Sequence, residues 1–372
     1  MALANNSVCY TDKPDGETFL REWTSLVESK SGERGIFNRI SAKEQAKKFG
    51  RRNPDYEFGT NPCSEIILRP YQFCNLTEVV IRDTDKFDDL KRKVMLATIL
   101  GTAQSTFTKF PYLRKVWKNN TEEERLLGVS LTGIMDNELT NGKKHGLEKT
   151  LTALREIAVE TNKEWSSIFG IPQSTAITCV KPSGTVSQLV DSSSGIHPRH
   201  SSYYIRTVRG DNKDPLTNFM KDSGIPSEAD FMKPDTQTVF SFPMKSPKKS
   251  VVRNDMTAIE QLEMWLLYQR HWCEHKPSVT VSVRDEEWME VGAFVFKHFD
   301  EMSGVSFLPH SDHTYQQAPY QDCTEAVYND FSSKFTHIDW NKFTDYEKED
   351  NTNSSQTFAC SGDSCEIVDI GA

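Results

Sequence analysis

Residues 175–187 read TAITCVKPSGTVS, and this stretch indicates a β-strand that ends in a glycine-containing turn. Thr, Ile and Val favour extended backbone over 175–180, and the Pro-Ser-Gly of 182–184 stops the run. Apolar residues at helical spacing over 147–169 place a helix shortly before this strand. The sequence therefore predicts a β/α unit here, with the turn at the carboxyl end of its strand.

The same alternation of helix and strand extends along most of the chain. The further elements predicted from periodicity and β-prone runs are helices at 87–100, 121–131, 258–274 and 286–302, and strands at 238–242, 278–283 and 305–309. Strands that alternate with helices of this length imply parallel pairing and an α/β fold. In such folds the functional loops follow the strands, so the loops after Val180 and Leu308 are candidates for a site.

The composition is that of a globular protein. The 372 residues carry a net charge of −9, whereas a nucleic-acid-binding surface needs a basic footprint. No apolar run approaches the ~20 residues that cross a membrane, and the first residues lack a signal-peptide pattern. The eight cysteines are therefore predicted to be reduced thiols in the cytoplasm. Four of them are assigned to core packing: Cys9, Cys179, Cys273 and Cys323.

A cluster of reactive groups lies in the stretch NPCSE at 61–65, and Cys74 follows eleven residues after Cys63. In an extended turn residues i and i+2 project to the same side, so Asn61, Cys63 and Glu65 are predicted to face one ligand. Glu65 then suits a general base, and Asn61 suits a hydrogen-bond anchor. The alternative is an ordinary buried thiol, although its two polar neighbours fit a dry core poorly.

The loop after the 175–180 strand is a candidate phosphate site. Its predicted ligands are Pro182, Ser183, Gly184, Thr185 and Ser187. Hydroxyl groups and free backbone amides at a helix start are suited to an anion. An ordinary turn is the alternative, and residues 194–198 either line the same pocket or form a plain loop.

A second pair of thiols, Cys360 and Cys365, lies in a polar segment at 351–372 that has too few apolar residues to fold alone. We interpret this pair as a mobile dithiol that delivers electrons by thiol–disulfide exchange. Exposed thiols or a zinc site are the alternatives, but structural zinc sites use shorter intervals and two pairs. At 310–313 a metal cluster and a packing loop are equally good interpretations, so no metal-binding residue is assigned.

The NPCSE stretch, Cys74, the Pro-Ser-Gly-Thr loop and the carboxyl-terminal dithiol together closely resemble ribonucleotide reductase. Residues 304–320 look like the adenosylcobalamin-dependent, class II enzymes of that family. The resemblance runs over nearly the whole chain but does not cover a whole enzyme. It implies adenosylcobalamin as the cofactor, a ribonucleotide (preferably a triphosphate) as the substrate, and thioredoxin or a similar dithiol as the donor.

The resemblance also implies a role for each site residue. Cys63 would form a thiyl radical at the tip of a finger loop and remove the 3′ hydrogen of the ribonucleotide. Glu65 would take the 3′-hydroxyl proton, and Asn61 would hold that hydroxyl. Cys74 would be one of two thiols that reduce the 2′ carbon. The tail dithiol would reduce the resulting disulfide, and the Pro-Ser-Gly-Thr loop would bind the substrate phosphates.

The family's fold is a ten-stranded α/β barrel made of two five-stranded halves, and the N-terminal half has no counterpart here. The expected architecture is the C-terminal half of that barrel with an inserted finger loop over 1–335, followed by a flexible tail over 336–372. A fragment or a split-gene product is expected, with the N-terminal half as a separate partner chain. That half would also carry the second reducing cysteine.

Two other functions were weighed against this one. A class I large subunit needs an adjacent tyrosine pair near its carboxyl end, whereas Tyr203-Tyr204 lies too far upstream. A non-catalytic subunit would keep the half-barrel for nucleotide or partner contact only. Such a scaffold has no use for Cys63, Glu65, Cys74 and a tail dithiol together, which favours the enzyme.

Overall fold

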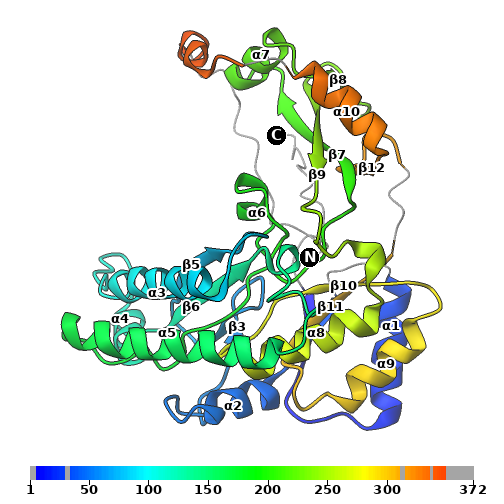
Figure 1. Ribbon diagram of the computed structural model, residues 1–372. Helices are drawn as coiled ribbons and strands as arrows, with labels where there is room; N and C mark the ends of the chain where they lie inside the picture. The colour runs from blue at the N-terminus through cyan, green and yellow to red at the C-terminus, as the bar shows by residue number, and fades with distance from the viewer. Residues whose placement is uncertain (1–5, 30–33, 311–314, 336–337, 349–372) are drawn as a thin grey trace. The chain divides into compact units, whose positions relative to one another are not determined.

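The structure is a computed structural model that describes residues 6–29, 34–310, 315–335 and 338–348. The chain forms two compact units, which are seen in Figure 1. The larger unit comprises Ala4–Arg199 and Lys249–His310. Among the described residues, the smaller unit comprises 200–248, 315–335 and 338–348.

Parallel strand pairing organises the larger unit. Its strands are β1 (Asn6–Tyr10), β2 (Arg34–Asn38), β3 (Gly59–Thr60), β4 (Ile67–Leu68), β5 (Asn75–Val80), β6 (Leu127–Thr132), β10 (Thr280–Val283) and β11 (Gly304–Pro309). β5 runs parallel to β6, and β10 runs parallel to β11. Parallel bridges from Val129 to Thr178 and from Val180 to Pro277 connect these two pairs. Five chain segments therefore run side by side in one direction.

Two further strands run in the opposite direction. β1 pairs in parallel with β2, and β2 pairs antiparallel with β11. The short strands β3 and β4 form an antiparallel hairpin of their own. The residues between them, 61–66, include the NPCSE stretch, so the sequence-predicted reactive cluster lies on the turn of a hairpin.

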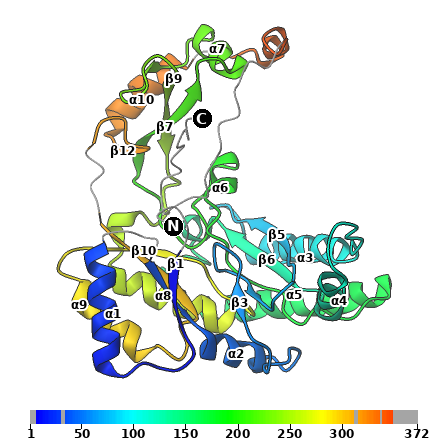
Figure 2. The same cartoon turned by 180° about the vertical axis from the view of Figure 1, so that it is seen from behind.

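Helices cover this strand system and build the core. They are α1 (Gly16–Ser29), α2 (Arg39–Lys48), α3 (Phe87–Gln104), α4 (Lys115–Glu124), α5 (Leu147–Phe169), α6 (Val186–Leu189), α8 (Ala258–His271) and α9 (Trp288–Lys297), with short 3-10 turns at Ile134–Asp136 and Arg253–Asp255. Figures 1 and 2 both show α3 and α5 side by side, and α3 packs on β5 and β6. Every residue of β6 is buried, as expected for a central parallel strand.

The predicted helix at 121–131 is wrong. The helix α4 ends at Glu124, Arg125 adopts the left-handed conformation with φ of 46°, and β6 begins at Leu127. A short apolar run fits a buried strand as well as a helix, and periodicity alone does not distinguish the two. Of the predicted strands, 175–180 forms bridges only, whereas 278–283 and 305–309 correspond to β10 and β11.

The smaller unit is an antiparallel sheet in the order β12-β7-β9-β8. Its strands are β7 (Tyr203–Asp211), β8 (Ser227–Ala229), β9 (Gln237–Lys245) and β12 (Tyr320–Asp322), and its helices are α7 (Pro215–Asp222), α10 (Glu325–Lys334) and a 3-10 helix at Trp340–Asp345. Phe219 of α7 packs its ring against Trp340, Phe343 and Tyr346. The predicted strand at 238–242 is the centre of β9.

The mixed α/β class predicted from the sequence is confirmed. Strands of the described residues do not close into a barrel, so the half-barrel stays a prediction. The division between 1–335 and 336–372 also stays a prediction, because 349–372 lie outside the described residues. Over the part of the chain that the structure describes, no helix has the length and apolarity needed to span a bilayer.

Candidate active site

The β3–β4 hairpin presents the reactive cluster on a tightly bonded turn. The amide of Ser64 donates to the carbonyl of Asn61 (2.9 Å), and the amide of Ile66 donates to the Asn61 side-chain oxygen Oδ1 (3.0 Å). Ser64 has φ of 66°, a left-handed conformation that side-chain-bearing residues adopt rarely. Because Oδ1 is engaged by the turn, the Nδ2 group of Asn61 is the part that remains to donate to a ligand.

Cys63 is an exposed residue of this turn, and Glu65, two residues later, is buried with 2% of its surface accessible. Desolvation by the surrounding atoms raises the pKa of Cys63, and the Glu65 carboxylate raises it further, whereas Lys181 and Lys276 lower it. Glu65 Oε2 is buried and has no hydrogen-bond partner among the described residues. An unpaired buried carboxylate oxygen is costly unless a ligand completes it.

Cys74 lies immediately before β5, where burial is the largest factor that raises the pKa of its thiol and Glu65 is the next. The fold makes room for this side chain with a glycine on the neighbouring strand. A Cβ on Gly128 would lie 3.2 Å from Cys74 Sγ and 2.8 Å from Ile66 Cδ1. Glu65 thus raises the pKa of both Cys63 and Cys74.

The Pro-Ser-Gly-Thr loop follows Val180, as predicted. Ser183 is buried with φ of 57°, and its Oγ has no hydrogen-bond partner among the described residues. Gly184 and Thr185 are exposed, and a Cβ on Gly184 would meet nothing within 4 Å. The hydroxyl of Ser187 shares a 2.6 Å hydrogen bond with that of Ser194, and Pro182 is half-buried. The loop thus offers one unsatisfied hydroxyl beside open space.

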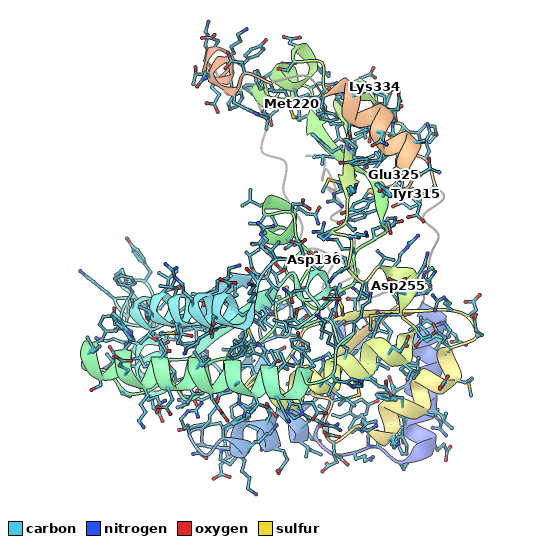
Figure 3. All side chains as sticks on the ribbon, viewed as in Figure 1. Asp136, Met220, Asp255, Tyr315, Glu325 and Lys334 are labelled. Carbon is cyan, nitrogen blue, oxygen red and sulfur yellow. The ribbon has the colours of Figure 1, made fainter. Side chains whose placement is uncertain are left out.

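A buried ion pair that the sequence analysis missed holds the neighbouring segment 191–193, next to the Ser194 that binds Ser187. Arg199 Nε and Nη2 donate to the two carboxylate oxygens of Asp136 at 2.9 and 3.0 Å. Asp136 also accepts from the amide of Ser193 (2.8 Å) and from the hydroxyl of Ser250 (2.9 Å). Asp136 is labelled in Figure 3. An isolated Asp and a distant Arg carry no spacing signal, so only the fold reveals the pair.

Lys276 is the second group that the sequence analysis missed, and it contacts the turn itself. Its Nζ donates to Ser64 Oγ at 2.7 Å, and Ser278 Oγ donates to the carbonyl of Cys63 at 2.6 Å. Next to it, the amide of Ile67 donates to His275 Nδ1 (3.3 Å), so Nε2 of His275 carries the proton that the Leu127 carbonyl accepts. Burial lowers the pKa of His275 to about 3.

The remaining candidates are scattered. Cys360 and Cys365 lie outside the described residues, as do Asp312 and His313. No group of three potential metal-binding side chains occurs among the residues that are described. Of the four thiols assigned to packing, Cys179 and Cys273 are buried as predicted, whereas Cys9 is exposed and Cys323 is half-buried.

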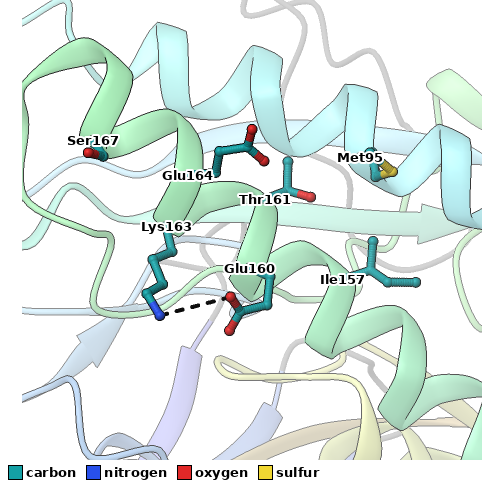
Figure 4. A pocket seen from close by; sticks show the side chains of 7 residues that line it. All are labelled: Met95, Ile157, Glu160, Thr161, Lys163, Glu164 and Ser167. Carbon is teal, nitrogen blue, oxygen red and sulfur yellow. Dashed lines mark ion pairs between the residues drawn. The ribbon is translucent and has the colours of Figure 1, made fainter.

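A pocket of about 510 Å³ opens between α3 and α5 (Figure 4), away from these groups. Its lining residues are Met95, Ile157, Glu160, Thr161, Lys163, Glu164 and Ser167. Lys163 and Glu160 form an ion pair across 4.0 Å on the exposed surface of α5. The pocket contains no thiol and no predicted site residue, so it is not the candidate active site.

Comparison with known proteins identifies relatives of the chain. It is 29% identical over 339 residues to a probable adenosylcobalamin-dependent ribonucleoside-triphosphate reductase of Dictyostelium discoideum, with 87% of this chain and 43% of that protein covered. It is 27% identical over 369 residues to the adenosylcobalamin-dependent ribonucleoside-triphosphate reductase of Lactobacillus gasseri, with 90% and 48% covered. The chain is thus similar in sequence to proteins named adenosylcobalamin-dependent ribonucleoside-triphosphate reductases. No family model matches it.

The solved structures agree with this relationship at the level of the fold. A B12-dependent class II ribonucleotide reductase matches with a TM-score of 0.79 and 24% identity, over 93% of this chain and 52% of that one. The class Id ribonucleotide reductase alpha subunit of Actinobacillus ureae matches less well, with a TM-score of 0.55 and 14% identity, over 82% and 65%. The chain spans less than half the length of the curated class II relatives named above.

Proposed function

We propose that this chain is the C-terminal catalytic part of an adenosylcobalamin-dependent ribonucleoside-triphosphate reductase. The observation that carries the proposal is the hairpin turn, where Glu65 lies beside the exposed Cys63 and its charge acts on Cys74 as well. The substrate is a ribonucleoside triphosphate, and the product is the corresponding 2′-deoxyribonucleotide. An N-terminal half, present as a separate chain, completes the barrel and the reducing pair.

The residues of the turn divide the first chemical step among them. Adenosylcobalamin, when bound, supplies the radical that oxidises the Cys63 thiol. The exposure of Cys63 at a hairpin tip fits a residue that must be reached from outside the turn. The Cys63 thiyl radical then takes the 3′ hydrogen atom of the ribose, while Glu65 accepts the 3′-hydroxyl proton. The unpaired Oε2 of Glu65 suits this acceptor role.

Two further groups hold the substrate in this scheme. Asn61, whose Oδ1 is fixed by the Ile66 amide, donates from Nδ2 to a ribose hydroxyl. The phosphates lie at the loop formed by Pro182, Ser183, Gly184, Thr185 and Ser187. The buried Ser183 hydroxyl without a partner supports this placement.

Reduction of the 2′ carbon releases the 2′-hydroxyl as water and requires two electrons. Cys74 and a cysteine of the N-terminal half supply these electrons and become a disulfide. Cys360 and Cys365 reduce that disulfide by exchange and are then reduced by thioredoxin or a similar dithiol donor. The high pKa of the Cys74 thiol in its buried setting favours the protonated form before reaction.

The proposal is tested with the chain combined with an N-terminal class II half, adenosylcobalamin, a ribonucleoside triphosphate and dithiothreitol. Formation of deoxyribonucleotide is expected, and Cys63→Ala is expected to abolish it. Turnover that survives Cys63→Ala would disprove the assignment. Nucleotide binding without any turnover, in a complex shown to contain both halves, would favour a non-catalytic binding subunit. A need for a separate metal-radical subunit would favour the class I alternative.

A further inference from the structure

Lys276 is a buried lysine with an unusual position. Only 1% of its surface is accessible, although lysine is almost never fully buried without a partner. Its ammonium group donates to Ser64 Oγ at 2.7 Å, and no salt bridge to it occurs among the described residues. Burying an ammonium group away from water is costly, so its retention at the reactive turn requires a reason.

The segment 276–278, which leads into β10, contacts three consecutive residues of the turn. Ser278 Oγ binds the Cys63 carbonyl, Lys276 Nζ binds the Ser64 hydroxyl, and the Lys276 amide donates to the Glu65 carbonyl at 3.3 Å. Two of these three contacts come from Lys276. Ser64 also has the left-handed backbone conformation, so this contact and the strained backbone occur at the same residue.

The neighbouring strand leaves room for the lysine head group. A Cβ on Gly304, the first residue of β11, would lie 3.1 Å from Lys276 Cε, from Lys276 Nζ and from Ser64 Oγ. Real Cβ atoms rarely approach other atoms so closely, so a larger residue would displace the ammonium group or the hydroxyl. The glycine therefore allows the contact between Lys276 and Ser64.

The charge of Lys276 faces the reactive groups. Burial lowers the pKa of Lys276 to about 8, while Glu65, Cys273, Cys63 and Cys179 act in the opposite direction. In return, Lys181 and Lys276 lower the pKa of Cys63 against the effects of desolvation and Glu65. Because this pKa lies above neutral pH, most Lys276 side chains are protonated there and place a buried positive charge at the turn.

We propose that Lys276 is a positioning residue that fixes the turn through Ser64 and supplies the positive charge that balances Glu65 and tunes Cys63. The inference rests on the proposed function for its catalytic meaning. Its physical content concerns only this chain, because every contact comes from the residues of the larger unit. Loss of the ammonium group should therefore change both the chemistry of Cys63 and the order of the turn.

The test measures the rate at which iodoacetamide alkylates Cys63 in the full chain, followed by peptide mass spectrometry between about pH 6 and pH 10. In Lys276→Met the thiol loses a nearby cation. If its pKa rises by about one unit, the thiolate fraction falls about tenfold, and the greater nucleophilicity of the more basic thiolate recovers about threefold. Alkylation near neutral pH should therefore slow about threefold. The difference should disappear well above pH 8, where Lys276 of the unaltered chain is itself neutral.

Three comparisons make the test specific. Ser64→Ala keeps the ammonium group but removes the hydroxyl that accepts its hydrogen bond. The alkylation of Cys63 should therefore keep its pH profile, while hydrogen exchange of the amides at position 64 and at Ile66 becomes faster. The remote Lys163→Met on α5 should change neither quantity. An alkylation profile of Lys276→Met that coincides with that of the unaltered chain would overturn the charge role. If Lys276→Met fails to fold, unchanged amide exchange in Ser64→Ala overturns the positioning role.

These measurements need no cobalamin, substrate or N-terminal half. A complex that fails to make deoxyribonucleotide would disprove the proposed function and leave the alkylation result standing. In an active complex, Lys276→Met should lower kcat more than it raises KM, because the phosphate loop is unaltered. An equal effect on alkylation at every pH would indicate general loosening of the fold and would contradict the role of the charge.

Discussion

At the scale of single residues, the turn at 61–66 shows how a short motif becomes a site. The alternation of Asn61, Cys63 and Glu65 was readable from the sequence, because polar groups around a thiol are unusual in a core. The sequence did not reveal that Asn61 closes the turn through Oδ1 or that Ser64 binds Lys276. The second contact depends on a residue more than two hundred positions away in the chain.

Gly128 offers a prediction at this scale. In Gly128→Ala the new Cβ would lie 2.5 Å from Leu76 Cδ2, besides its contacts with Ile66 and Cys74. Overpacking of this kind costs about 1–3 kcal/mol, and urea unfolding should show that loss. Gly59→Ala is the matched control, since a Cβ on Gly59 meets nothing within 4 Å. A Gly128→Ala chain as stable as the Gly59→Ala chain would contradict the packing around Cys74.

A second residue-scale prediction concerns the buried ion pair between Asp136 and Arg199. Asp136→Asn removes the buried carboxylate that pairs with Arg199, and such a loss costs about 3 kcal/mol of unfolding free energy. Asp191→Asn is the control, because Asp191 pairs with the same arginine at 2.8 Å but its side chain is 63% exposed. Its loss should cost less than about 1 kcal/mol. Equal losses in urea unfolding would show that burial does not decide the strength of these pairs.

At the scale of elements, the sequence predicted the helix–strand alternation but misassigned residues 121–131. The run from Leu126 to Leu131 could not be distinguished from a helix, because a strand buried on both faces shows no alternation of apolar and polar residues. Residues 175–180 form only bridges, although the turn that follows them lies where a strand end was expected. The buried partners Lys276, His275 and Asp136 lay beyond prediction, since their burial is decided by segments distant in sequence.

His275 joins the strands β4 and β6, because its side chain accepts from the Ile67 amide on β4 and donates to the Leu127 carbonyl on β6. Its folded pKa of about 3 is below the ordinary value of 6.5, so the folded chain binds fewer protons than the unfolded chain below pH 6.5. The stabilising contribution is complete above pH 6.5 and is lost as the pH falls toward 3. By pH 5 the loss from this group is about 2 kcal/mol.

His275→Gln removes this titration while its amide can still accept from Ile67 and donate to Leu127. Urea unfolding at several pH values between about 5 and 7 should therefore give a smaller decline in stability for the variant than for the unaltered chain. Comparing the two slopes cancels the contributions of all other titrating groups. Parallel slopes would show that His275 is not held neutral between the hairpin and β6.

At the scale of the whole molecule, the proposed reaction separates into a reducing pair, formed by Cys74 and a cysteine of the N-terminal half, and an electron supply in the tail. The double variant Cys360→Ser with Cys365→Ser removes only the supply, in a complex with the N-terminal half. Turnover driven by thioredoxin should be lost, because exchange with a buried disulfide needs an attacking thiol that can reach it. Turnover driven by dithiothreitol should persist, because a small dithiol reaches Cys74 directly. Cys74→Ser should abolish both, and thioredoxin-driven turnover that survives the tail double variant would contradict the shuttle.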